Sequence, residues 1–147
     1  MRAIPFFCVA VLIFTGCQSV REFPAPSPHW KTAQGQLQYT TPQRSVIGEV
    51  ALSSDGAQNF QLDYLAGPGV PLMRLRMSGD AVKTEGIFGK RPSWVALRDV
   101  FVKVGNAKSG TFQSAPGKTQ WTATVSGQRV QVKFPRTQER FTFVLMR

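Results

Sequence analysis

Cysteine and histidine are almost absent from this 147-residue chain, and each absence excludes a class of protein. The two cysteines are Cys8 and Cys17, and the only histidine is His29. Zinc and iron sites usually need several Cys or His ligands, so we expect no metal site. Nucleophilic catalysis needs a base, and His29 lies in a proline-containing run, while the eight acids form no recognisable pair for acid–base chemistry. The sequence therefore predicts a protein without cofactor that is not an enzyme.

Long apolar runs are also scarce, and the one that exists lies at the N-terminus. It covers residues 4–14 and follows a single charge, Arg2. A membrane-spanning helix needs about 20 residues, so this run is too short to span and is typical of a secretory signal peptide. It ends in the sequence FTGC at residues 14–17, which resembles the lipobox of bacterial lipoproteins, where the cysteine is acylated and becomes the first residue. An ordinary signal peptide, with Cys17 incidental, is the alternative.

The lipobox resemblance implies an organisation and a location for the chain. We expect residues 1–16 to be a lipoprotein signal peptide, residues 17–34 a lipidated Cys17 with a proline-rich tether, and residues 35–147 a single β-rich domain. Cys17 would be the one cysteine left, so no internal disulfide is expected. Gln18 is not the Asp that favours inner-membrane retention. The resemblance thus implies a lipid anchor in the bacterial cell envelope, in the outer membrane and facing the periplasm.

Negative charge is in deficit. The chain has 18 Lys and Arg against 8 Asp and Glu, and loss of Arg2 with the signal leaves a net charge of +9. In the cell envelope the available anions are lipid and cell-wall groups, so nucleic acid is not an expected partner. Because the basic residues are scattered, they make either an ordinary solvated surface or one that faces anionic lipid headgroups.

Alternation of apolar and polar residues dominates the rest of the chain and predicts β-strands. Residues 59–65 are the clearest case, since Phe60, Leu62 and Tyr64 share one face. Similar patterns predict strands over residues 36–40, 47–52, 70–77, 81–85, 121–125, 129–134 and 141–146. The last of these is apolar on both faces, so we expect it to be covered on both sides.

One segment has a different period. In residues 92–104, large apolar residues recur every three or four positions (Trp94, Leu97, Phe101 and Val104), which predicts a helix. Ser93 is a candidate N-cap, and the glycine at 105 is a natural helix end. A strand is the alternative because residues 100–102 are good β formers. The fold class that follows is mainly β: a curved antiparallel sheet or half-open β-barrel of seven or eight strands, with about one helix packed against it.

Large apolar side chains are in surplus, and a curved sheet can enclose an apolar cavity instead of a solid core. The candidate lining residues are Phe60, Leu62, Tyr64, Leu75 and Trp121. Ordinary core packing is the alternative for each of them.

Residues 48–52, 60–64 and 71–80 resemble consecutive strands of the LolA/LolB group of lipoprotein carriers and receptors. The resemblance implies that an apolar half-barrel binds a lipid or acyl chain, in lipoprotein or lipid transport to the outer membrane. The expected partners are then the membrane, held through the N-terminal lipid, and a lipid ligand. The alternative function is a non-catalytic β-sandwich that serves as an interaction or scaffold subunit of an envelope complex.

Overall fold

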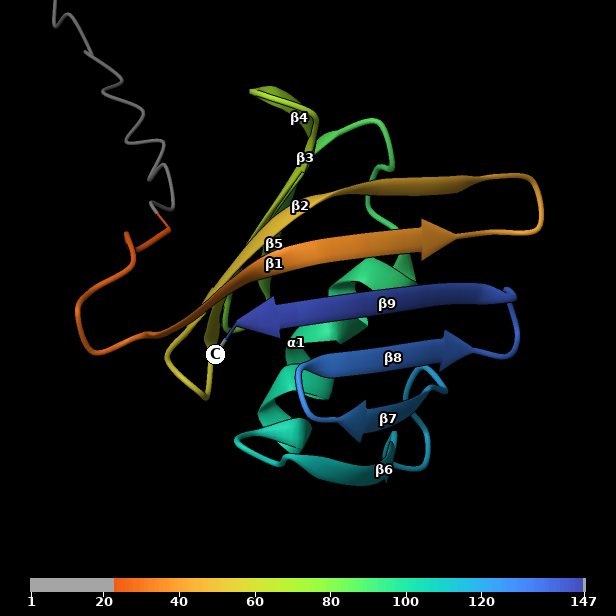
Figure 1. Ribbon diagram of the computed structural model, residues 1–147. Coiled ribbons are helices and arrows are strands. Elements are labelled where there is room, and N and C mark those ends of the chain that lie inside the picture. Colours follow the sequence, from red (N-terminus) through yellow and green to blue (C-terminus); the bar gives the residue numbers. More distant parts are fainter. Residues whose placement is uncertain (1–22, 147) are drawn as a thin grey trace, which may run out of the picture.

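The computed structural model describes residues 23–146, which form nine strands and a helix (Figure 1). The elements are β1 (Lys31–Thr40), β2 (Ser45–Ser54), β3 (Asn59–Ala66), β4 (Val70–Ser78), β5 (Ala81–Gly86), α1 (Pro92–Val104), β6 (Ser109–Gln113), β7 (Thr122–Ser126), β8 (Arg129–Phe134) and β9 (Glu139–Met146). Within residues 23–146, no helix has both the length and the apolar character needed to span a membrane.

All nine strands belong to one antiparallel sheet in the order β5-β4-β3-β2-β1-β9-β8-β7-β6. Each strand pairs with a neighbour in sequence, except that the first and last strands, β1 and β9, pair with each other and join two meanders. The sheet curves without closing into a barrel, so β5 and β6 are its edges. The predicted fold class, a curved antiparallel sheet with one helix, is confirmed.

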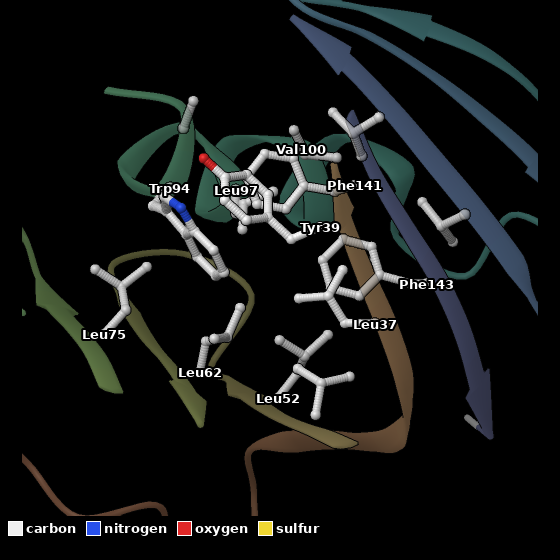
Figure 2. Packing of buried hydrophobic residues seen from close by; sticks show 14 of the residues in the cluster. Leu37, Tyr39, Leu52, Leu62, Leu75, Trp94, Leu97, Val100, Phe141 and Phe143 are labelled. Carbon is white, nitrogen blue, oxygen red and sulfur yellow. The ribbon is translucent and has the colours of Figure 1, made fainter. Parts of the chain in front are cut away.

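The helix α1 connects the two edges and lies across one face of the sheet (Figure 1). The apolar stripe of α1 packs on the strand residues that face inward. Because side chains alternate along a strand, every second residue of a strand lies on the face of the sheet that α1 covers. Figure 2 shows the side chains of Trp94 and Leu97 on the side of α1 that faces the strands, with the Trp94 ring directed toward Leu62 and Leu75 of the sheet. All four are fully buried. The core therefore lies between α1 and the concave face of the sheet.

An added strand and the early start of β1 are the main differences from the strands predicted from the sequence. The structure adds β6, whose residues are mostly exposed and show no apolar alternation, so that its pairing with β7 could not be read from its own sequence. In addition, β1 begins at Lys31, because residues 31–34 pair with residues 51–54 of β2. The last part of the expected tether, residues 17–34, is thus a strand.

The last strand differs from prediction in its surroundings. Its residues Phe141, Phe143 and Leu145 are buried, whereas Val144 is 40% and Met146 67% exposed. The expectation that both faces of β9 are covered is therefore wrong. The physical reason is that α1 covers the concave face, while the convex face of the strand stays in contact with solvent.

The helix boundaries agree with the prediction, but the predicted cap does not. Helix α1 spans Pro92–Val104 and ends at Gly105, whose φ of 54° is easily adopted by glycine. The N-cap residue is Arg91, which makes no capping hydrogen bond through its side chain. Ser93 lies inside the first turn and donates a hydrogen bond to Glu139 instead.

Candidate functional site

Aromatic side chains fill the concave face beneath the first turns of α1. The indole ring of Trp94 lies 4.9 Å from the rings of both Tyr39 and Phe141, and 5.3 Å from that of Phe88, between ring centroids. Tyr64 adds a fifth ring, 5.9 Å from Trp94. Aromatic pairs at about 4.5–7 Å attract one another in addition to burying area. This part of the concave face is therefore packed core, in which all five rings are buried.

The five residues predicted to line a cavity are all buried, but they do not surround one hollow. Leu62 and Leu75 face each other across β3 and β4 and have no exposed surface. Tyr64 belongs to the aromatic set, and its hydroxyl lies 3.0 Å from the carbonyl oxygen of Leu37. Trp121, just before β7, borders a hollow near residues 113–117. Phe60 borders a different one, described below.

A buried polar cluster ties the start of α1 to the sheet. The carboxylate of Glu139, which is 4% exposed, accepts hydrogen bonds from the Tyr39 hydroxyl and, at 2.6 Å, from the Ser93 hydroxyl. A guanidinium nitrogen of Arg91 lies 4.0 Å from the same oxygen. A buried carboxylate is tolerated when it is paired and hydrogen-bonded in this way. The cluster thus joins β1, β9 and α1 at one point.

The environment of the cluster also changes the acidity of Tyr39. Burial, followed by the hydrogen bond and charge of Glu139, raises the pKa of Tyr39 to about 12. A phenol with this pKa stays protonated at neutral pH, and its hydroxyl donates a hydrogen bond to the carboxylate. Ser93 is 2% exposed and is bonded to a carboxylate in the core. The arrangement therefore stabilises the position of the helix and presents no accessible nucleophile.

Sequence reasoning missed the role of Glu139, although a signal was present. Glu139 is in phase with Phe141, Phe143 and Leu145, the inward-facing residues of β9. An acid in phase with a buried apolar face needs a partner, since an unpaired buried charge is costly. That partner could not be identified from the sequence, because Tyr39 lies 100 positions away.

An apolar groove opens at the other end of α1, where the helix ends above the first strands. We call it the α1–β1 groove; its volume is about 440 Å³. Its apolar surface comes from Ala33, Leu52, Phe60, Phe101, Val102 and Leu145. Its polar lining comes from Lys31, Thr32, Ser53, Ser54 and Asn106, and the Lys31 ammonium donates a hydrogen bond of 3.5 Å to Asn106. Groove residues come from β1, β2, β3, β9 and α1, so the groove exists only in the folded sheet.

Local features explain why the groove is open at this end. Phe101 packs on Phe60 and Phe143, with ring centroids 6.2 and 5.1 Å apart, and these rings close the groove on the side of the core. The helix then stops at Gly105, so no further turn covers the strand ends beyond it.

A larger hollow of about 530 Å³ lies against another part of α1, but Lys90, Arg98 and Lys118 give it a more charged lining. The α1–β1 groove is the better candidate for an apolar ligand.

Two further expectations concern metals and the lipid anchor. Among residues 23–146, no three His, Cys, Asp or Glu side chains are grouped so that they could hold a metal ion. Cys17, the predicted lipidation site, lies outside the described residues.

A scan against models of protein families finds no family that matches this chain, and a search of curated proteins finds no similar one.

Proposed function

We propose that this protein is a membrane-anchored lipoprotein of the bacterial cell envelope that binds a lipid or acyl chain in the α1–β1 groove. We further propose that it acts in lipoprotein or lipid transport to the outer membrane. The observation that carries the proposal is the groove itself, with six apolar side chains around about 440 Å³. That volume is within the range of about 300–1,000 Å³ typical of small-molecule sites.

The chemistry of the groove suits an acyl chain. Ala33, Leu52 and Leu145 offer aliphatic contacts, and Phe60 and Phe101 add two aromatic faces. Each apolar contact made by a bound chain removes surface from water, at about 25 cal/mol for each Å². A linear hydrocarbon needs no hydrogen-bond partner, and the apolar wall of the groove offers none.

The position of the groove suits a lipid-anchored protein. Lys31 and Ala33, at the start of β1, border the groove, so the chain leaves the domain beside its opening. Residues 17–31 can span at most about 50 Å when extended, at about 3.5 Å for each residue. A lipid on Cys17 would therefore keep the groove close to the membrane from which a lipid is taken or to which it is delivered.

Ligand binding can be tested with a variant that fills the groove. Val102 is 44% exposed on α1 and borders the groove, so Val102→Trp should occupy the space without disturbing the core. We expect the full chain to bind a fluorescent fatty acid and to carry lipid in native mass spectrometry, and Val102→Trp to lose both. The matched control is Ile47→Trp at an exposed position of β2. Absence of binding by the unmodified protein would refute the proposal.

Lipid attachment is tested separately. We expect an alkyne-tagged fatty acid, fed to bacteria that express the full chain, to label the protein and to place it in the membrane fraction. Cys17→Ser should abolish the label and release the protein, whereas Cys8→Ser should change the mature protein in neither respect. Labelling that survives Cys17→Ser would exclude the proposed anchor.

The exposed convex face supports the second candidate, an interaction subunit without a ligand. Val144 and Met146 alternate along this face of β9, and exposed Ile47 lies on the same face of β2. Exposed apolar residues of this kind often mark contact surfaces. If this candidate is correct, the purified protein binds no lipid, and Met146→Lys reduces recovery of a defined partner from detergent extracts.

A further inference from the structure

The α1–β1 groove continues into a second hollow that carries a positive charge. This hollow, of about 400 Å³, lies beside Lys108, Gly127 and Gln128, and it shares Asn106 and Leu145 with the groove. The two hollows therefore adjoin along Leu145. We call the two hollows together the trough; it contains the apolar side chains of the groove and two lysines, Lys31, whose ammonium lies 3.5 Å from the shared Asn106, and Lys108 in the second hollow.

The trough has positive side chains and no acidic ones. Among the described residues that line the two hollows there is no Asp or Glu. The nearest acid in sequence is Asp55, beside Gly56 of the groove. Its carboxylate already accepts hydrogen bonds from the backbone N–H groups of Ala57 and Asn59, at 2.9 and 3.0 Å.

The end of α1 contributes a partial negative charge, because the last carbonyl groups of a helix lack partners within the helix. In this protein two of these carbonyls are occupied. The N–H of Gly105 bonds to the carbonyl of Phe101, at 2.9 Å, and the N–H of Ala107 bonds to that of Val104, at 3.1 Å. Lys103 also lies in the last turn. Lys31 and Lys108 therefore set the sign of the charge in the trough.

We infer that the trough binds a long-chain fatty acid, with the hydrocarbon along Leu145 and the carboxylate at Lys31 or Lys108. This inference rests on the proposed function and adds the nature of the head group. A carboxylate is favoured over a phosphate monoester, because the single positive charge of one lysine balances the charge of a carboxylate, whereas a phosphate monoester carries a charge of about −1.5 to −2 at pH 7. The amide of Asn106, where the hollows meet, offers a donor to the same carboxylate.

The test compares ligands that share one chain length and differ in the head group. Dodecanoate, 1-dodecanol, dodecyltrimethylammonium and lauroyl lysophosphatidate compete with a fluorescent fatty acid for the full chain. We expect dodecanoate to bind about two- to fivefold more tightly than the alcohol, since an exposed ion pair contributes a small but measurable attraction. The ammonium compound should bind weakest. The preference should shrink at high salt, which screens exposed charges.

Charge-removing variants assign the preference to the two lysines. The double variant Lys31→Gln/Lys108→Gln should lose the preference, so that the ratio of dodecanoate affinity to dodecanol affinity falls to about one. Lys83→Gln, on the edge strand β5, removes a positive charge away from the trough and should keep that ratio.

The outcomes separate this inference from the proposed function. If no ligand binds, both are refuted. If dodecanoate and dodecanol bind equally, and Val102→Trp blocks both, the proposed function is supported and the inference is overturned. The inference is also overturned if the double variant keeps the preference, or if lysophosphatidate binds more tightly than dodecanoate.

Discussion

The hydrogen bonds of the buried carboxylate should behave as a coupled unit in unfolding experiments. Tyr39→Phe removes one donor to Glu139, and Ser93→Ala removes the other. A hydrogen bond to a charged group contributes about 1.5–3 kcal/mol, so each single variant should lose about 2 kcal/mol of unfolding free energy. Of the partners found within residues 23–146, the carboxylate in the double variant keeps Arg91, at 4.0 Å and half exposed.

The double variant should therefore lose more stability than the sum of the two single variants. We expect an excess of about 0.5–3 kcal/mol, the range found for residues that share one network. Urea unfolding followed by tryptophan fluorescence and by circular dichroism measures all four proteins of the cycle. Tyr64→Phe is the matched control, because its hydroxyl contacts neutral backbone carbonyls and should contribute about 1 kcal/mol.

Two results would refute this reasoning. One is a loss for Tyr39→Phe that is no larger than the loss for Tyr64→Phe. The other is strict additivity in the cycle, which would mean that the carboxylate of Glu139 does not depend on both donors.

Three further predictions concern tyrosine ionisation, strand pairing and the bare convex face. Burial, first among the causes, raises the pKa values of Tyr39 and Tyr64 to about 12. The folded state therefore holds these protons more tightly than the unfolded state does, and the free energy of unfolding should fall as pH rises from about 10 to 12. Absorbance at 295 nm should show phenolate appearing only with unfolding. Gly35→Ala places a Cβ against the carbonyl oxygen of Val144, where β1 meets β9, and should cost about 1–3 kcal/mol in chemical unfolding. Met146→Gln, on the exposed face of β9, should change stability by no more than about 0.5 kcal/mol.

Each of these three predictions has a control variant at a neighbouring position or a result that would contradict it. Phenolate absorbance at pH 10 in the folded protein would contradict the burial of both tyrosines, which are the only two in the chain. Gln34→Ala, next to Gly35 and exposed, should be nearly neutral. Leu145→Ala, one residue from Met146 but buried, should cost about 2–5 kcal/mol. Equal effects at positions 145 and 146 would mean that the two faces of β9 are not distinguished by α1.

The pattern of the sequence predicted the helix more exactly than it predicted the strands. Pro92 fixes a backbone angle suited to a first turn, and Gly105 suits a helix end, so both boundaries are local properties. The strand β6 has no such local signal, because its exposed residues are placed by hydrogen bonds to β7. For β9 the alternation predicted which residues point in the same direction. It did not predict that the face of Val144 and Met146 is bare.

The candidate site could be predicted only in part, for the same reason. Phe60 and Trp121 were expected to line one apolar cavity, but Phe60 borders the α1–β1 groove and Trp121, just before β7, borders a different hollow. Phe101 and Leu145, which form the groove with Phe60, were assigned to a helix stripe and a strand without any sign that they meet.

The sequence by itself determined the period of each segment, the ends of α1 and the scarcity of histidine and cysteine, because these depend on neighbouring positions or on composition. The tertiary structure alone decided that β1 pairs with β9, that Glu139 receives hydrogen bonds from Tyr39 and Ser93, and that the ends of α1 and β1 frame an apolar groove. These features join residues that are far apart in the chain. Their positions follow from the curvature of the sheet and the packing of one helix across it, which no local pattern encodes.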